Sequence, residues 1–572
     1  MELTRRSFVE GAGAAAAGIA AVSASAALAS PAAAVAEEAA AEETEVFPWG
    51  NEAPVIDEAD VEEELECDVV IVGVGLAGAA ATLGAAEAGA ASVITFDKTE
   101  EGHSATGNQT AVINGIQEKW GRAGIYDIAE ICNHEINECC GWPKHAIWFK
   151  WANGIGDTFN WCLDTLGDYE ILDNGNVGMG FEGNYVAPMA YPLPEGFHPE
   201  SEYNTTYATS VAWSSGNWVP AALERAGEIC DLKTYGSHRV EQLIVEDGRV
   251  CGCYAYNYET AKYKKVRANK GVVLSCGDYT GDKAMYKYYL PEQYANGVTL
   301  MYNTRDPEGN AANTGEAIKM GTWIGARVDQ HHAVNGHHMG HSMTGGIGSM
   351  GIAPFMRVNK FGKRFMNEDQ PGQQTENQME LQKDFGCFMI WDADWCNEVD
   401  SFAPTHGSVY HFLQEGETGE GKSQADLDDS VASGETFKAD TIEDLLSQLD
   451  AVYGLDVETA KASIERYNEL AHNGNDEDFG KLASRLFPIE KAPFYATTMG
   501  LASMLSSTSG LESDEECHTF DQDRNIIPGL YCAGNSQGNR FNIQYPIAME
   551  GVATSMCIFY GRVAGENVVK GA

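Results

Sequence analysis

The clearest pattern of apolar positions runs from Cys67 to Asp97. The unbroken apolar run at residues 69–72 is typical of a strand that is buried on both faces of a parallel sheet. An Ala-rich segment of high helix propensity follows and ends at Gly89, and a second apolar run at residues 93–96 leads into Asp97. Strand, helix and strand in this order predict a βαβ unit.

The turn after the first strand carries Gly73, Gly75 and Gly78 in the pattern G-x-G-x-x-G. These glycines allow a tight turn and let the backbone approach a pyrophosphate at the helix N-terminus. Asp97 follows about 20 residues later, where a carboxylate can accept hydrogen bonds from a ribose hydroxyl. The unit therefore predicts dinucleotide binding, and the alternative is a tight turn without a ligand.

Weaker patterns predict further elements. The Asp-Gly pair at residues 247–248 predicts a hairpin turn within residues 242–250. Residues 271–275 predict a buried strand that enters a glycine loop. Thr441 is expected to cap a helix whose first turn is acidic, and residues 551–569 predict a terminal helix.

The N-terminus has the composition of a targeting segment. Residues 4–9 (TRRSFV) resemble the twin-arginine export motif, an Ala/Gly tract follows at residues 11–29, and residues 34–36 offer a cleavage site. We expect a signal peptide at residues 1–36 and a location in the periplasm or on the outer face of the cytoplasmic membrane. The alternative is an N-terminal membrane helix. The Ala- and Glu-rich residues 37–65 predict a flexible acidic linker.

The overall charge restricts the partners. The 572 residues include 84 Asp and Glu against 37 Lys and Arg, a formal charge of −47. Such a surface repels nucleic acid and anionic membranes, so we expect no nucleic-acid partner. The 14 cysteines form neither C-x-x-C nor C-x-x-C-H, which argues against an attached c-type haem and a ferredoxin-like cluster.

A histidine-rich stretch spans residues 331–341 and contains His337 and His338. Its spacings lack a helical H-x-x-x-H with a general base, and no carboxylate triad surrounds them. We therefore predict no metal site.

Several segments resemble one known family. They are residues 106–116 (TGNQTAVINGI, similar to GGNAKLAAGGM), 271–278 (GVVLSCGD, similar to VVLATGG), 358–368 (VNKFGKRFMNE, similar to VNKDGKRFVNE), 527–535 (IPGLYCAGN, similar to IPGLYAAGE) and 561–565 (GRVAG, similar to GRIAG). As a set, over residues 66–572, they resemble the fumarate reductase/succinate dehydrogenase-like flavoproteins and the related ketosteroid dehydrogenases. The resemblance implies an α/β fold: a Rossmann-like FAD-binding domain with an inserted α+β capping domain. The expected boundaries are 66–345 for the first FAD-binding part, 346–488 for the cap and 489–572 for the second part.

The resemblance also implies that the cofactor is FAD. Membrane-bound members hold FAD through a covalent bond to a histidine, and the alignment places Asn108 there, so we expect non-covalent FAD. His103 lies close enough to keep the covalent alternative open. The expected cofactor contacts are Gly73, Gly75, Gly78, Asp97, Lys98, Thr106, Gly107, Asn108, Thr110, Cys276, Gly277, Asp278, Gly534 and Asn535.

The family pattern breaks at the residues that act on fumarate. The proton-donating arginine of the cap corresponds to Gly372, and the paired histidines of HHTMGG correspond to residues 506–507, which are serines. These changes argue against fumarate as substrate. In the family, a substrate-side histidine corresponds to His337 or His338.

Two further candidates for catalysis remain. Arg540 corresponds to a carboxylate-binding arginine, and the alternative is a surface or FAD-phosphate contact. Tyr545 resembles the tyrosine that activates the ketone in ketosteroid dehydrogenases, because a phenol stays protonated at neutral pH and can stabilise a developing enolate. The alternative is a structural tyrosine.

These features favour an exported FAD-dependent reductase of an activated C=C bond in a small α,β-unsaturated carboxylate or enone. Hydride would pass from flavin N5 to the substrate. No haem motif and no second βαβ fingerprint for NAD(P)H is recognisable, so we expect a separate electron donor, and a membrane-associated c-type cytochrome is one candidate. One alternative is a 3-ketosteroid-type dehydrogenase that runs the reverse reaction. The other is a non-enzymatic flavin electron carrier, against which the cap counts.

Overall fold

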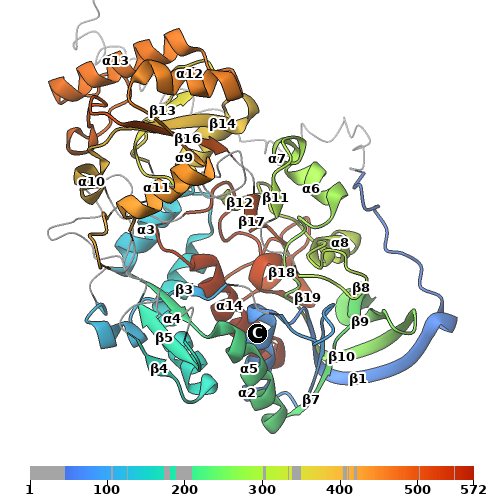
Figure 1. Ribbon diagram of the computed structural model, residues 1–572. Helices are drawn as coiled ribbons and strands as arrows, with labels where there is room; N and C mark the ends of the chain where they lie inside the picture. Colours follow the sequence, from blue (N-terminus) through green and yellow to red (C-terminus); the bar gives the residue numbers. More distant parts are fainter. Residues whose placement is uncertain are drawn as a thin grey trace, which may run out of the picture. The chain divides into compact units, whose positions relative to one another are not determined.

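The computed structural model describes residues 46–104, 107–124, 127–172, 181–188, 209–300, 304–332, 334–337, 350–370, 372–402, 409, 411–417, 421–500, 503–546 and 548–571 (Figure 1). By its internal contacts the chain divides into Met1–Phe47 and Pro48–Ala572. The second unit contains every element described below.

The largest sheet among the described residues has eight strands, in the order β18-β19-β10-β1-β2-β7, with β9 paired to β10 and β8 paired to β9. Their bounds are β1 Val61–Val72, β2 Ser92–Phe96, β7 Asp231–Tyr235, β8 His238–Glu246, β9 Arg249–Asn257, β10 Lys262–Leu274, β18 His518–Phe520 and β19 Ile526–Cys532. Strands β1, β2, β7, β10 and β19 are parallel. Residues 69–72 are buried between β10 and β2, which confirms the prediction from their unbroken apolar run.

Helix α2 (Leu76–Glu87) crosses from β1 to β2 and packs closely against the terminal helix α14 (Val552–Lys570). The glycines of the GRVAG segment make this approach possible. A Cβ atom at Gly561 would lie 2.2 Å from the carbonyl oxygen of Ala77, and one at Gly565 would lie 2.1 Å from that of Ala81. Only glycine fits these two positions, so the motif is explained by helix packing.

The prediction of a flexible linker as far as residue 65 is wrong for its last part. A short helix η2 covers Glu58–Asp60, and β1 already begins at Val61. Its acidic residues face basic residues of the neighbouring strand: Lys264 Nζ lies 2.6 Å from Glu63, and Lys265 Nζ lies 2.8 Å from Glu58. Pairing with β10 satisfies the backbone hydrogen-bonding groups of β1, and the two lysines offset the acidic charges of this segment.

Two local predictions are confirmed. Strands β8 and β9 form a hairpin, and both residues of its turn, Asp247 and Gly248, have positive φ, as the Asp-Gly pair favours. The hydroxyl of Thr441 accepts a hydrogen bond from the backbone N–H of Asp444 and caps helix α12 (Ile442–Tyr453).

The cap is built on a second sheet, in the order β13-β14-β16-β15 (Figure 1). Its elements are β13 Met356–Asn359, α9 Gly372–Glu380, β14 Gly386–Trp391, α10 Trp395–Glu398, α11 Gln424–Ser433, β15 Thr436–Ala439, α12, α13 Val457–Asn473 and β16 Phe494–Gly500. Side chains of β14 alternate: Phe388 and Ile390 pack with α12 and α13, whereas Met389 and Trp391 pack with α10 and α11. Helices therefore cover both faces of this sheet.

The predicted return to the FAD-binding part at residue 489 is too early. Strand β16 pairs with both β14 and β15. Its apolar side chains are buried in the two cores of the cap. The chain leaves the cap sheet only after Gly500.

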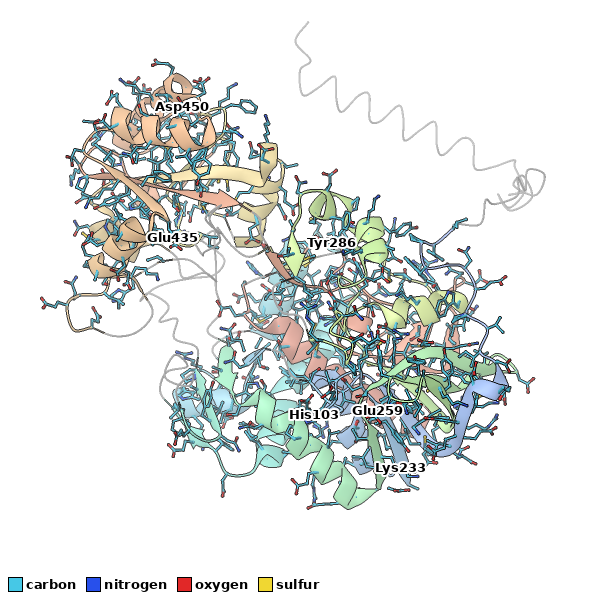
Figure 2. The ribbon with its side chains drawn as sticks, turned by 45° about the vertical axis from the view of Figure 1, so that its right-hand side comes forward. His103, Lys233, Glu259, Tyr286, Glu435 and Asp450 are labelled. Carbon is cyan, nitrogen blue, oxygen red and sulfur yellow. The ribbon has the colours of Figure 1, made fainter. Side chains whose placement is uncertain are left out.

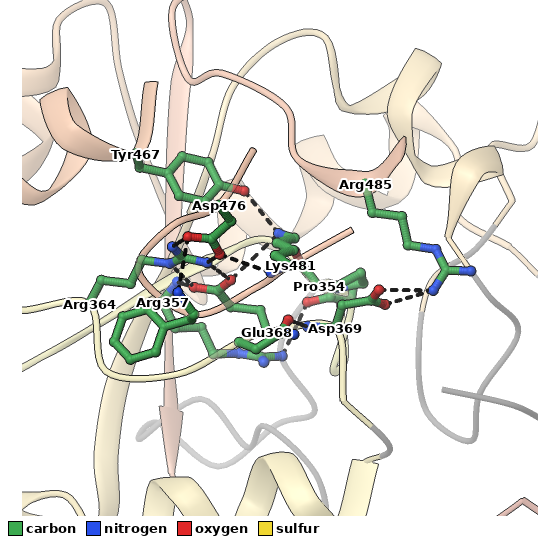
Figure 3. Close-up of polar contacts among 12 residues, drawn as sticks. Pro354, Arg357, Arg364, Glu368, Asp369, Tyr467, Asp476, Lys481 and Arg485 are labelled. Atoms are coloured by element: carbon green, nitrogen blue, oxygen red, sulfur yellow. Dashed lines mark hydrogen bonds and ion pairs between the residues drawn. The ribbon is translucent and has the colours of Figure 1, made fainter. Parts of the chain in front are cut away.

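A buried ion-pair network holds the start of the cap in place (Figure 3). Arg364 lies 2.8 Å from both Glu368 and Asp476, and all three side chains are at most 6% exposed. Lys481 lies 3.6 Å from Glu368 and donates a hydrogen bond to the hydroxyl of Tyr467. The segment GKRFMNE that resembles the family is thus fixed by ion pairs to Asp476 and Lys481, more than 100 residues later in the chain.

Further elements extend the FAD-binding part. They are η3 Gly115–Trp120, α3 Ile128–Glu138, α4 His145–Leu166, α5 Ser215–Ile229, α6 Lys283–Tyr289, α7 Pro291–Ala295, α8 Glu316–Trp323, the sheet of β3 Gln109–Ala111, β6 Ser210–Trp213, β5 Tyr185–Pro188 and β4 Glu170–Ile171, and the sheet of β11 Thr299–Leu300, β17 Ser503–Ser507 and β12 Val334–His337. Across the described ranges, every helix is too short or too polar to span a membrane.

Candidate cofactor and substrate site

A cavity of about 920 Å³ opens at the carboxyl ends of four parallel strands. Its wall includes the residues that follow β1 (73–77), β2 (97–99), β10 (275–278) and β19 (534–535). It continues past β17 to the start of α14, where Leu505, Ser506, Tyr545 and Glu550 contribute. The carboxyl edge of a parallel sheet is where α/β proteins bind their ligands.

The start of α2 presents free backbone donors to this cavity. Gly75 is the N-cap residue and provides no side-chain hydrogen bond, so the first amide groups of the helix remain available, and Gly75, Leu76 and Ala77 line the wall. Gly73 has a φ of +85°, and a Cβ there would lie 2.5 Å from the Cα of Cys276. The geometry fits a pyrophosphate. Gly78 lies off the wall, and its missing side chain lets α2 pack onto the turn.

Asp97 is fixed at the wall beside this turn. One carboxylate oxygen accepts from Val74 N at 2.7 Å, and the other accepts from the amide and the hydroxyl of Thr99 at 2.9 and 2.7 Å. A carboxylate has about four acceptor positions, so one remains for a ribose hydroxyl.

Lys98 also lies on the wall, but its ammonium group is fully engaged. It donates to the carbonyl oxygen of Ala312, to the hydroxyl of Thr314 and to the carboxylate of Glu316, at 2.7, 2.6 and 2.7 Å. With three donors used inside the protein, it supports the wall rather than offering a free cation.

The loop after β10 brings Cys276, Gly277 and Asp278 to the wall. Burial raises the pKa of the Cys276 thiol to about 12, so the group is a neutral thiol. Burial also raises the pKa of Asp278, although Asn313 and the backbone N–H of Ser507 donate to its carboxyl group at 2.5 and 2.8 Å. Gly277 has a φ of +84°, and the place of its missing Cβ is open space.

The segment that resembles the flavin-wrapping stretch is partly on the wall. Gly107 and Asn108 line the cavity, and Trp213 N donates to the carbonyl oxygen of Asn108 at 3.1 Å. Thr110 is buried off the wall, where its hydroxyl accepts from the indole of Trp213 at 2.9 Å, so its part is structural. Thr106 lies outside the described residues. His103, which Figure 2 labels, is not among the lining residues.

Tyr545 lies on the wall near the start of α14 and is 6% exposed. Its hydroxyl oxygen accepts a hydrogen bond from the backbone N–H of Ala553 at 3.2 Å. Burial raises the pKa of the phenol. The hydroxyl therefore keeps its proton, and that proton remains available to a partner in the cavity.

Arg540 does not line the cavity, contrary to the expectation that it forms an open carboxylate fork. Its guanidinium is fully buried and 5.1 Å from the ring centroid of Phe541. Nη2 donates to Oδ1 of Asn535 at 2.9 Å, and Nε donates to the carbonyl oxygen of Gln537 at 3.0 Å. Arg540 is linked to the cavity through its hydrogen bond to Asn535, which is a lining residue.

The histidine-rich stretch is only partly described. His337 ends strand β12 opposite Met504, and His338 lies outside the described residues. His332 accepts from the hydroxyl of Tyr279 at 2.8 Å, while its Nε2–H donates to the carbonyl oxygen of Asp329. Burial lowers its pKa to about 3, so it is a neutral structural histidine. Among the described residues no group of His, Cys, Asp or Glu is arranged to hold a metal ion.

Sequence reasoning missed several wall residues, namely Asn313, Glu316, Ser506, Glu550 and Cys557. Two of them have a signal in the sequence: Ser506 replaces a histidine of the family, and Glu316 lies in residues 315–317, which resemble a family turn that starts a helix near the flavin. The other three reach the cavity through long-range packing and carry no motif.

The chain is similar to known proteins both in sequence and in structure. A family model described as FAD binding domain matches residues 68–130 and 182–551. Digoxin reductase of Eggerthella lenta is 26% identical over 540 residues, which cover 90% of this chain and 89% of that protein. Urocanate reductase of the same organism is 24% identical, covering 91% of this chain and 77% of that protein. The structure of 3-ketosteroid-Δ4-(5α)-dehydrogenase from Rhodococcus jostii RHA1 matches with a TM-score of 0.61 at 20% identity, covering 90% of this chain and 99% of that one. The predicted fold class is confirmed.

Proposed function

The chain belongs to the FAD binding domain family, and on that premise we propose that this FAD-dependent oxidoreductase reduces an activated C=C bond. The proposed substrate is a small α,β-unsaturated carboxylate or enone. The observation that carries the proposal is one continuous cavity that joins the pyrophosphate-type turn at Gly73 to the protonated phenol of Tyr545. Two relatives over most of this chain's length are themselves named as reductases, which supports this direction.

FAD held by the glycine turn and Asp97 would supply hydride chemistry toward the β-carbon of the substrate, and the α-carbon would take up one proton to complete the reduction. The protein then has to stabilise the negative charge that develops on the carbonyl oxygen. Tyr545 offers a neutral donor at the wall, and its raised pKa prevents ionisation at physiological pH. Tyr545 itself is buried, and a hydrogen bond in a buried setting is electrostatically stronger than one in water.

The attachment of FAD and the location of the protein belong to the same proposal. Asn108 on the wall has no side chain capable of the histidine-type bond, so we propose non-covalent FAD. We propose export through the twin-arginine signal at residues 4–9 and a separate electron donor, such as a membrane-associated c-type cytochrome. The described cavity offers one βαβ turn, which FAD would occupy.

The runner-up function is the reverse reaction, a dehydrogenase of a 3-ketosteroid or similar ring. The Tyr545-Pro546 pair favours it, because a phenol that polarises a ketone serves both directions. The redox partner then decides which direction operates.

Anaerobic oxidation of reduced methyl viologen tests the proposal. The purified holoenzyme should oxidise the dye when an enoate or an enone is added. One molecule of saturated product should accumulate for every two dye molecules oxidised, because each reduced viologen gives one electron. A holoenzyme that oxidises the dye with no member of a broad panel would refute the reductase. Reduction of a dye acceptor by saturated ketosteroids would then support the dehydrogenase.

A further inference from the structure

We propose that the hydroxyl of Ser506 donates a hydrogen bond to the carbonyl oxygen of an uncharged enone, and that Asn535 and Arg540 hold it in this orientation. The inference rests on the proposed C=C reduction and narrows its substrate class to ketones. It also assigns Arg540 a positioning role in place of direct substrate binding.

The chain of hydrogen bonds has a defined direction. A guanidinium carries only donors, so the atom of Asn535 that faces Arg540 at 2.9 Å is the amide oxygen. This fixes the amide, and its nitrogen faces Ser506 Oγ at 3.3 Å. Because an amide nitrogen only donates, the Ser506 oxygen is the acceptor. The hydrogen of Ser506 must therefore point to another partner.

The position of Ser506 makes the substrate that partner. Ser506 and Asn535 both line the cavity and are half-buried, whereas Arg540 lies behind them and is fully buried. Tyr545 lies on the same wall with its proton also available. Two neutral donors on one wall suit a carbonyl oxygen that becomes an enolate.

The charges of the wall argue against a carboxylate at this place. The described lining residues include four acidic side chains, Asp97, Asp278, Glu316 and Glu550, and one cation, Lys98. The three donors of Lys98 are already taken, so the described lining residues offer no free cation to an anionic substrate. A ketone needs none.

The identity of residue 535 decides which group donates and which accepts in this series of hydrogen bonds. The family resemblance has an acid at this position. An aspartate would accept from Arg540 but could not donate to Ser506, and the serine hydrogen would then turn toward the carboxylate. Asn535→Asp is therefore a nearly isosteric change that reverses one hydrogen bond and places an acid at this position, where the family motif has glutamate.

The test compares two ligands that share a styryl group conjugated to a carbonyl carbon, 4-phenylbut-3-en-2-one and cinnamate; the methyl group of the ketone takes the place of one carboxylate oxygen. The wild-type holoenzyme should prefer the ketone. Ser506→Ala should lower kcat/KM for the ketone about 100-fold and change that for cinnamate much less. Asn535→Asp should have a similar effect, and the double variant should lose no more than either single one, because both changes remove the same hydrogen bond.

Ser509→Ala is the matched control. Its hydroxyl donates to the carbonyl oxygen of His331 at 3.2 Å, and it does not line the cavity. It should leave the kinetics with both ligands unchanged. FAD content and the visible spectrum of the bound flavin should match the wild type in every variant.

Three results of these measurements would overturn the inference, and the binding titration below adds a fourth. One is a Ser506→Ala enzyme with wild-type kinetics toward the ketone. Another is a shift of the flavin spectrum and midpoint potential with an unchanged KM for the ketone, because Ser506 would then contact the flavin. The third is an additive loss in the double variant.

A binding titration separates this inference from the proposed function. The ketone should perturb the spectrum of the oxidised flavin without turnover, and Ser506→Ala should weaken this binding about tenfold or more. If the wild type binds the ketone through Ser506 but oxidises no viologen, the proposed function fails and the ketone site stands. If Ser506→Ala binds as the wild type does, the inference fails whatever the turnover.

Discussion

Replacing Tyr545 by phenylalanine removes one oxygen from the cavity wall and keeps the ring. The hydroxyl has two tasks. Its oxygen accepts from the backbone N–H of Ala553 in the first turn of α14, and its hydrogen serves the substrate. The two tasks have different consequences, so the variant should show one effect on stability and a larger one on rate.

The expected magnitudes follow from these contacts. A buried N–H that loses its acceptor costs roughly 1–3 kcal/mol of unfolding free energy. A donor removed from a developing oxyanion costs roughly 3–4 kcal/mol of transition-state stabilisation, or about 10²–10³ in turnover. Because burial raises the phenol pKa above its ordinary value of about 10, the wild-type rate should show no loss from tyrosine ionisation below about pH 10.

The assay is anaerobic viologen oxidation with the best enone, alongside thermal unfolding and FAD quantification. Tyr286→Phe is the matched control, because its hydroxyl donates to the carbonyl oxygen of Val298 at 2.7 Å and is not on the cavity wall (Figure 2 labels Tyr286). It should lower stability by a similar amount and leave turnover intact. Near-wild-type turnover of Tyr545→Phe with full FAD occupancy would refute the reasoning, and the donor would then have to be sought elsewhere on the wall.

Four further predictions concern the cofactor, export, the substrate and the cap. With Asn108 on the wall, acid should release all flavin; flavin fluorescence on the denatured polypeptide would contradict this. The mature chain should begin near Glu37, and export should fail when the arginine pair is replaced by lysines; peptides from residues 2–30 in the exported protein would show otherwise. Fumarate turnover should be about 10²–10⁴-fold below that of the best substrate, since Gly372 cannot donate a proton, and comparable rates would disprove the assignment. Burial opposes ionisation of Asp476, but hydrogen bonds, with that from Arg364 the largest, lower its pKa to about 2, so its contribution is present above about pH 4 and is lost as the pH falls toward 2. Asp476→Asn should therefore cost about 2 kcal/mol of unfolding free energy at pH 7 and flatten the acid limb of a denaturation series; an unchanged acid limb would exclude this role.

The βαβ unit and its glycine turn follow from the sequence by itself. An unbroken apolar run, an Ala-rich segment and a second apolar run are local patterns, and each sets its own element without help from distant residues. The Asp-Gly hairpin turn and the Thr441 cap are local in the same sense, because the interacting groups lie within a few residues of each other. The motifs shared with the family also predicted the order of the FAD-binding parts and the cap along the chain.

Only the tertiary structure decided the features that depend on distant partners. The acidic segment before Cys67 has the composition of a linker, and it is a strand because lysines about 200 residues later face it across the sheet. Strand β16 has an apolar pattern that suits either domain, and its place is set by its neighbours β14 and β15.

The site shows the same division. The sequence indicates that Arg540 lies near the cofactor, but the direction of its guanidinium depends on where Asn535 and Gln537 lie around it. The direction of the guanidinium in turn decides that Asn535 donates and Ser506 accepts in the hydrogen bond between them. A motif specifies which groups are present, whereas packing decides which of their donors remain free to meet a substrate.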